Sequence, residues 1–374
     1  MKRMLEKGRL STKQLSVLVI FSVIGESLLV IPSSVAEEAK QDAWISGLIG
    51  MTAGLLIAWM IFRIGQTYGP KTLIEHNRAL LGRWAGGTVS VLYLLYFLIN
   101  ISALIREIGD FITTQFLPET PLRAVHLIIV ILIIWAVKSG LETLARAGEV
   151  FFPLFAVLLI SMFVFLLPQF HSDRLQPMLG QGIPSILRGS LFIFAFPFCE
   201  LIVLLMIFPY VAHNPKLQKD YMLAVLFGGL TICLLILISI LVLGPNLSAY
   251  HSYASYAIAQ KISIGHFVER LEALLAVNWI VSTYYKISLF YYGLILGSAQ
   301  LFNLRDYRQL TVPTGMIVFG LAFIISPNIV YFNAKVSYWV IIDILFALLI
   351  PALLFFIGLT RRKKRLKRPA SAEK

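Results

Sequence analysis

The chain has 374 residues, of which 58% are hydrophobic and only 14% carry a charged side chain. Soluble domains carry roughly 25% charged residues, so this composition excludes an ordinary soluble fold. The formal net charge of +13 is best explained by basic loops on the cytoplasmic side of a membrane. We therefore expect the lipid bilayer, and no nucleic acid, as a partner. The two cysteines, Cys199 and Cys233, both lie in apolar runs, so neither a disulfide framework nor a cysteine-based metal site is expected.

Apolar stretches bounded by charged or turn-forming residues recur along the whole chain. A helical membrane crossing needs about 20 apolar residues, and ten stretches of 16–33 residues are candidates. They predict an all-α integral membrane domain over 15–360, preceded by a cytoplasmic segment, 1–14, and followed by a basic cytoplasmic tail, 361–374. The ten predicted spans cover about 15–35, 43–62, 85–117, 124–139, 149–168, 184–209, 220–243, 268–298, 311–326 and 337–360.

The basic side chains predict how these spans are oriented. With the N-terminus inside, 23 of the 32 lysines and arginines fall on the cytoplasmic side, eight fall outside, and Lys286 lies within a span. Positive charge resists translocation, so both termini are expected in the cytoplasm. The first apolar run has the length of a span and no clear cleavage site, so we expect it to remain in the mature protein. The basic tail is either an orientation signal or a contact for anionic lipids.

Two predicted spans, the first and the sixth, contain residues that interrupt a helix. The first holds Gly25-Glu26-Ser27 with a proline soon after, and the sixth holds Pro197 within the run from Phe194 to Glu200. Proline removes a backbone donor and clashes with the preceding turn, so each helix is expected to kink or split. Either break alone is consistent with a simple packing kink. Two breaks five spans apart favour an inverted-repeat transporter fold, with repeats over about 15–168 and 184–360.

The aromatic run that ends in an acid, from Phe194 to Glu200, resembles the sixth-helix motif of the amino acid/polyamine/organocation transporter superfamily. Longer parts of the chain resemble the B subunits of spore germinant receptors, also called the endospore germination permease family. The stretches that carry this resemblance are Tyr68–Glu75, Leu117–Pro121, Gly140–Pro153 and Pro197–Tyr210. The ten-span layout extends the resemblance across nearly the full chain.

The resemblance implies a five-plus-five inverted repeat in which helices one and six line a pocket for a small nutrient, such as an amino acid. It also implies two partners, a larger A subunit and a C lipoprotein, and a location in the inner membrane of the bacterial spore. The chain departs from the family pattern at Glu26, because relatives have a small residue after the glycine of the first helix. This departure argues against direct recognition of an amino acid's carboxylate at that position.

Ionisable side chains at membrane depth are functional candidates, because each costs about 2.5–3.5 kcal/mol at the middle of a span. Glu26, Glu200, Lys286 and Asp343 lie well inside predicted spans. We expect Glu200 either to bind the ammonium group of a nutrient or to hold the broken sixth helix open through hydrogen bonds. In the fold that the chain resembles, helix eight forms a cation site beside the break of helix one. We therefore hypothesise that Lys286 replaces that cation and pairs with Glu26; the alternative is that it snorkels or binds backbone carbonyls.

Two sets of site residues follow from these patterns. A gating or polar pathway set includes Arg106 and Asp110, which are four residues apart on one helical face and form either a local ion pair or an outer gate. It also includes Glu107 between them, and Arg146 and Glu149, which we expect to form a structural pair, with closure of the inner end as the alternative role. The predicted ligand-binding set comprises Gly25, Glu26, Ser27, Phe194, Pro197, Phe198, Glu200, Tyr285 and Lys286.

These features predict a nutrient-sensing membrane subunit of a spore germination receptor that binds a small molecule between helices one and six and signals to partner subunits. Two alternatives stay open. One is a proton-coupled permease for an amino acid or polyamine, in which Glu26 or Glu200 carries the proton, and the other is a membrane scaffold that binds no nutrient. The sequence has no GxxxxGK[ST] loop, no HExxH and no GxSxG, so we expect no enzyme activity, no cofactor and no metal.

Overall fold

The structure is a computed structural model and describes residues 8–261, 272–354 and 357. Within these residues the chain is almost entirely helical, and its one β-type contact is an isolated bridge between Leu10 and Val211. The predicted basic tail, 361–374, most of the N-terminal segment and the ends of two predicted spans, near 268–271 and 355–360, fall wholly or largely outside the described residues.

The first predicted span consists of two helices, α1 (Thr12–Ile24) and α2 (Ser27–Ala39), which are separated by Gly25 and Glu26. Ser11 caps α1 by accepting a hydrogen bond from the backbone N–H of Gln14. A short 3-10 turn then reverses the chain into α3 (Ala43–Tyr68). The predicted break in the first span is therefore present at the position that the glycine indicates.

The next helices complete the first half of the chain, and glycines with positive φ separate α4 from α5 and α6 from α7. The helix α7 begins eight residues before the predicted start of the fifth span. The first turns of α7 carry charged side chains, so the apolar run that predicts the fifth span begins after them. The helices are α4 (Leu73–Leu81), α5 (Arg83–Gln115), α6 (Leu122–Ser139) and α7 (Leu141–Leu166), followed by the 3-10 turns η2 (Leu167–Gln169) and η3 (Ser172–Leu175).

The sixth span does not split; its winding changes instead. The helix α8 (Ile183–Ile193) continues as a π-helical turn, η4 (Phe194–Phe198), and then as a 3-10 helix, η5 (Cys199–Met206). Pro197 lies inside the π-helical turn, where a wider turn accommodates a residue that lacks a backbone donor. The predicted break thus takes the form of a local change of helix type.

The second half of the chain contains both long spans and short surface helices. The longer helices are α9 (Leu217–Leu243), α12 (Glu272–Leu301), α13 (Thr311–Ile324) and α15 (Val336–Ile344), the last of which continues into a π-helical turn, η8 (Leu345–Leu349). The shorter ones are η6 (Phe208–Tyr210), α10 (Pro245–Tyr250), α11 (Ala254–Ala259), η7 (Tyr307–Leu310) and α14 (Ile329–Ala334).

Eight helical stretches of the described residues are long and apolar enough to cross a membrane. The first of them, Thr12–Thr67, has 56 residues and is too long for one crossing, since it contains both α1–α2 and the returning α3. The helix α13, with 14 residues, is shorter than these stretches and matches the predicted ninth span. The predicted multi-span, all-α membrane architecture is therefore confirmed.

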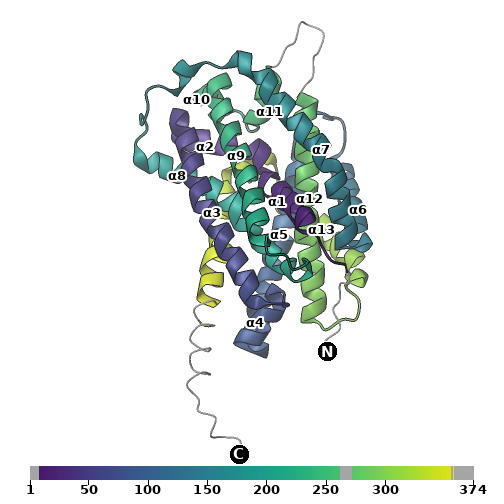
Figure 1. The fold of residues 1–374 in the computed structure, drawn as a ribbon. Helices are drawn as coiled ribbons and strands as arrows, with labels where there is room; N and C mark the ends of the chain where they lie inside the picture. Colours follow the sequence, from purple (N-terminus) through teal and green to yellow (C-terminus); the bar gives the residue numbers. More distant parts are fainter. Residues whose placement is uncertain (1–7, 262–271, 355–356, 358–374) are drawn as a thin grey trace, which may run out of the picture.

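The helices pack as a bundle in which α10 and α11 lie at one end and α4 lies at the other (Figure 1). The helix α1 packs against α9, α12 and α7, and α12 also packs against α5. The helices α6 and α7 lie at the periphery and expose large apolar side chains such as Trp135 and Val150, as helices that face lipid do. The broken first span is therefore enclosed by other helices.

Gly25 tests whether the break in the first span depends on a glycine. Its φ is +22°, and a Cβ at this position would lie 2.7 Å from Cδ of Lys286. We expect Gly25→Ala to lower the free energy of unfolding by about 1–3 kcal/mol, measured by thermal denaturation in detergent. The control is Gly87→Ala, because Gly87 lies within α5 with open space around it and its replacement should be neutral or stabilising. Equal effects of the two substitutions would contradict a special role for Gly25.

Candidate functional site

The break between α1 and α2 lies against α12, which supplies partners for the backbone carbonyls that the break frees. The indole Nε1–H of Trp279 donates to the carbonyl of Glu26 over 3.3 Å. The hydroxyl of Ser282 lies 3.5 Å from the carbonyl oxygen of Gly25. Membrane interiors offer no water to such groups, so these contacts stabilise the non-helical backbone at this depth.

Lys286 of α12 lies one helical turn beyond Ser282 and joins the two interrupted spans. Its Nζ lies 2.7 Å from a carboxylate oxygen of Glu26 and 2.6 Å from Oε2 of Glu200. It also donates to the carbonyl of Phe196 over 3.2 Å. The expected pair of Glu26 and Lys286 is therefore present, and Glu200 joins it. We call these three residues the ion cluster.

The ion cluster is removed from solvent. The side chains of Lys286, Glu200 and Glu26 expose only 1%, 5% and 7% of their surface. A buried ion is tolerated only when its attraction to a partner and its hydrogen bonds offset the loss of hydration. The contacts of Lys286 therefore tie together the first, sixth and eighth spans, since it lies 260 positions from Glu26 and 86 positions from Glu200 in the sequence.

Two further acids are buried near the ion cluster. Asp343 of α15 accepts a hydrogen bond from the hydroxyl of Tyr96 over 2.8 Å. Glu107 of α5 exposes 7% of its surface, and its Oε1 has no hydrogen-bond partner among the described residues. Acids thus outnumber bases in this part of the interior. One oxygen of Asp343 also lacks a hydrogen-bond partner, whereas Glu107 has neither a hydrogen bond nor an ion pair among the described residues.

A cavity of about 50 Å³ adjoins the ion cluster. One water molecule needs roughly 10–15 Å³ measured in this way, so the cavity holds a few water-sized groups. Its wall comes from the break in the first span, α2, α5, the π-helical turn of the sixth span, and α14–α15. The polar lining residues are Glu26, Asn100, Glu107 and Glu200; the aromatic ones are Phe196, Phe332 and Trp339; the aliphatic ones are Val30, Ile31, Ala103, Leu104 and Val336.

The structure brings only part of the predicted ligand-binding set to this cavity. Glu26 and Glu200 line it, and Lys286, Gly25 and Ser27 lie directly behind Glu26. The other predicted residues, Phe194, Pro197, Phe198 and Tyr285, are absent from its wall.

Two of these aromatic side chains point elsewhere for identifiable reasons. The ring of Phe198 packs against α3, where a Cβ on Gly54 would lie 2.2 Å from it. The ring of Tyr285 stacks on Phe21 with a centroid separation of 4.7 Å. Both positions belong to broken or adjoining helices, but their rotation about the helix axis directs them away from the cavity.

One face of α5 lines the cavity, although α5 is not among the helices predicted to carry ligand-binding residues. Asn100, Ala103, Leu104 and Glu107 follow the spacing of one helical face, and this spacing is a signal that the sequence does contain. Glu107, which was predicted to act in gating, therefore lies in the cavity wall instead. Phe196, Phe332 and Trp339 have no comparable signal, because aromatic residues are frequent in these spans.

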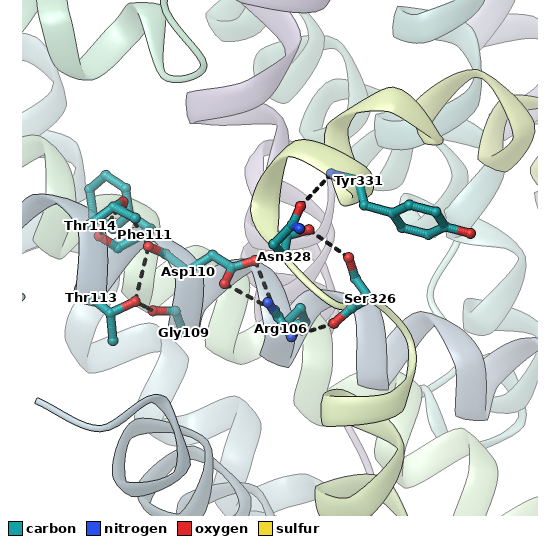
Figure 2. A network of polar contacts seen from close by, with 9 residues as sticks. All are labelled: Arg106, Gly109, Asp110, Phe111, Thr113, Thr114, Ser326, Asn328 and Tyr331. Atoms are coloured by element: carbon teal, nitrogen blue, oxygen red, sulfur yellow. Dashed lines mark hydrogen bonds and ion pairs between the residues drawn. The ribbon is translucent and has the colours of Figure 1, made fainter.

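The predicted pair of Arg106 and Asp110 is present on α5, at 2.9 Å, and is buried. Arg106 does more than pair locally, since its Nη1 donates to the carbonyl of Ser326 over 2.6 Å. Figure 2 shows how this contact continues: the hydroxyl of Ser326 donates to the carbonyl of Asn328, and the side chain of Asn328 accepts from the backbone N–H of Tyr331. Arg106 thus holds the segment that leads from α13 into α14. The helix α14 contains Phe332, which lines the cavity.

The predicted pair of Arg146 and Glu149 is wrong. Arg146 pairs with Glu142, one turn earlier on the exposed surface of α7, at 2.6 Å. Glu149 accepts a hydrogen bond from the side chain of Gln14 over 3.1 Å. Spacings of three and four residues both place side chains on one helical face, and the acid at the four-residue spacing has the better geometry here.

A larger hollow, of about 400 Å³, lies at the end of the bundle that holds α10 and α11. Phe111 of α5 lies between Glu107 of the cavity and Thr114 of the hollow along the same helix. Its ring makes edge-on contacts with Tyr253, Tyr256 and Trp279 at centroid separations of 5.0, 5.4 and 4.8 Å. Two of these aromatic partners, Tyr253 and Tyr256, also line the hollow.

The ion cluster predicts a non-additive response to substitution. Lys286→Met leaves two carboxylates without their cation and should cost about 3–5 kcal/mol of unfolding free energy. The triple variant with Glu26→Gln, Glu200→Gln and Lys286→Met removes all the charges and should recover most of this loss. Chemical denaturation in detergent measures both variants. Losses that add up over the single substitutions would show that the three groups do not interact.

Comparisons with known proteins agree with the geometry. A family model described as "Spore germination protein" matches residues 9–331. The chain is 30% identical to spore germination protein KB of Bacillus subtilis (strain 168), over 97% of this chain and 98% of the relative. It is 29% identical to the putative spore germination protein YfkT of the same organism, over 87% and 89% of the two chains.

Two solved structures show the fold. The structure of MhsT in complex with L-phenylalanine has a TM-score of 0.63 at 14% identity, over 95% of this chain and 89% of the other. The structure of MHP1, a nucleobase-cation-symport-1 family transporter with bromovinylhydantoin bound, has a TM-score of 0.67 at 11% identity, over 90% and 76%. The chain therefore has an inverted-repeat transporter fold, as expected. By its sequence and its architecture, this multi-pass membrane protein belongs to the spore germination protein family.

Proposed function

We propose that this chain is the nutrient-sensing membrane subunit of a germinant receptor, and that a small nutrient binds in the cavity beside the ion cluster. The observation that carries the proposal is the position of this cavity. It lies where the two interrupted spans meet, and it is lined by Glu26 from one span and Glu200 from the other. MhsT and MHP1, which have this fold, are described with small organic molecules bound.

The ion cluster offers a way for binding to change the conformation. Lys286 holds the first, sixth and eighth spans together, and in this proposal it replaces the cation that the resembled transporter fold binds beside the break of helix one. A solute that contacts Glu26 and Glu200 competes with Lys286 for the same carboxylates. A ligand shifts a conformational equilibrium only through its different affinities for the two states, and this competition supplies such a difference.

The gating residues fit the same proposal at the two ends of the bundle. The contact of Arg106 with Ser326 holds the segment that leads to Phe332 of the cavity wall, and in this proposal the hollow beyond Phe111 is the entrance for the nutrient. At the other end, the contact of Gln14 with Glu149 joins α1 to α7 and acts as an inner closure. Opening of either end requires the loss of a hydrogen bond or ion pair.

The partners and the location are part of the proposal. We expect this subunit to act beside a larger A subunit and a C lipoprotein in the inner membrane of the spore, with both termini in the cytoplasm. Membership of the spore germination family supports this assignment. The family is not an enzyme family, and the proposed action is to bind and to signal without covalent chemistry.

Ligand-dependent stabilisation of the purified chain tests nutrient binding. Binding raises the unfolding free energy by about 2.7 kcal/mol when the ligand is at 100 times its Kd. A panel of amino acids, amines, nucleosides and sugars is therefore expected to contain a class that raises the thermal midpoint of the wild type. The same class should leave Glu200→Gln unchanged, while Glu142→Gln, which alters an exposed acid, should respond like the wild type. The absence of a shift with every compound would reject binding by this chain alone.

Solute flux in proteoliposomes separates sensing from transport. A sensor binds its nutrient without moving it, so labelled nutrient is expected to remain outside vesicles that contain the chain, with or without a proton gradient. Accumulation driven by the gradient would instead establish the proton-coupled permease. A scaffold would show neither binding nor flux, although its deletion would still remove the A subunit from the membrane.

A further inference from the structure

We infer that the cavity is built for a small primary ammonium cation without a carboxylate group, and that Glu107 is the residue that receives its positive charge. This inference rests on the proposed function and names the chemical class of its ligand. Glu107 has so far no assigned ligand, and it approaches the cavity from α5, a different helix from those that carry Glu26 and Glu200.

The charge balance of the cavity favours a cation. Its wall contains the carboxyl groups of Glu26, Glu107 and Glu200, and no basic side chain is among the described residues that line it. Lys286, which lies behind the wall, is held by Glu26 and Glu200. A low-dielectric interior strongly disfavours uncompensated charge, so an added cation is attracted to this site and an added anion is repelled.

Glu107 is the acid of the cavity wall that has neither a hydrogen bond nor an ion pair among the described residues. Glu26 and Glu200 are both engaged by Lys286. Asp343 has one oxygen without a hydrogen-bond partner, but its other oxygen accepts a bond from Tyr96 and it lies outside the cavity wall. The carboxyl group of Glu107 is more than nine-tenths buried, borders the cavity, and has an oxygen without any hydrogen-bond partner among the described residues. Native proteins rarely leave a buried polar atom unsatisfied, so a donor from a ligand is the partner that completes it.

The rest of the cavity suits an ammonium group with a short apolar tail. Phe196, Phe332 and Trp339 present aromatic rings to it, and aromatic faces attract cations. The volume of about 50 Å³ accommodates roughly three or four water-sized groups, which is close to the size of propylammonium. The wall contributes carboxyl groups from three separate segments, and an ammonium group has several N–H donors to meet them.

A carboxylate on the same ligand is not accommodated. A buried carboxylate needs a cationic or N–H partner. Arg106, the nearest arginine of α5, is already bound by Asp110 and the carbonyl of Ser326, and the side-chain amide of Asn100 in the cavity wall already donates to the carbonyl of Tyr96 over 3.0 Å. The position that follows the glycine of the first span is itself an acid, Glu26. Amines are therefore expected to bind more tightly than the amino acids with the same carbon skeleton.

Calorimetric titration of the purified full-length chain tests this inference. The probes are propylammonium, the uncharged alcohol 1-propanol, alanine, and the chlorides of sodium and potassium at equal ionic strength. We expect propylammonium to bind, and the other four to bind at least tenfold more weakly. A hydrogen bond to a charged group contributes enough for Glu107→Gln to weaken propylammonium binding by about ten- to a hundredfold.

A matched variant tests whether propylammonium needs contact with Glu107 or only the negative charge of any buried acid nearby. Asp343→Asn removes one negative charge from a buried acid outside the cavity wall and should change propylammonium affinity by less than threefold. The thermal midpoint of unliganded Glu107→Gln should equal or exceed that of the wild type, because an unpaired buried charge is removed. A midpoint well below that of the wild type would indicate a structural role instead.

Several outcomes would overturn the inference. These are equal binding of propylammonium and 1-propanol, equal loss of affinity in Glu107→Gln and Asp343→Asn, or tighter binding of alanine or of either alkali cation. If sugars or nucleosides stabilise the chain in the panel described above while no amine binds, the inference fails and the proposed function stands. If no compound of any class binds, the proposed function fails as well.

Discussion

The ammonium group of Lys286, held between the carboxylates of Glu26 and Glu200, is the interaction on which the centre of this protein depends. Each of these ions would be costly alone in the membrane interior, and each is tolerated because the others are present. The three side chains come from spans that are far apart in the sequence. Their mutual dependence therefore fixes how the two interrupted spans and α12 are placed relative to one another.

The unusual backbone of the interrupted spans follows from the same interaction. Gly25 allows Lys286 to pass close to the chain, since a Cβ would collide with the lysine stem. The π-helical turn at Phe194–Phe198 presents the carbonyl of Phe196 to the same ammonium group. The freed carbonyls of Gly25 and Glu26 face Ser282 and Trp279. A local departure from helical geometry is thus stabilised by side chains from a neighbouring helix, as the absence of water requires.

The helix α5 connects this centre to the periphery, because consecutive residues of one turn point in different directions. Glu107 faces the cavity, whereas its neighbour Arg106 holds Asp110 and the carbonyl of Ser326. A rotation or shift of α5 would disturb both contacts together.

The sequence by itself determined the class of protein, the multi-span layout and the break at Gly25, and it offered the pairing of Glu26 with Lys286 as one of two alternatives, which the structure then decided. Long apolar runs, helix-breaking residues and rare buried charges are strong local signals, because a bilayer penalises every exception to them. The tertiary structure decided that Glu200 joins this pair, that Glu107 lines the cavity, and that Arg146 pairs with Glu142. It also decided that Phe198 and Tyr285 point elsewhere. These outcomes depend on how each helix is rotated, and a helix that is apolar on all sides carries no periodic signal of which face is turned inward.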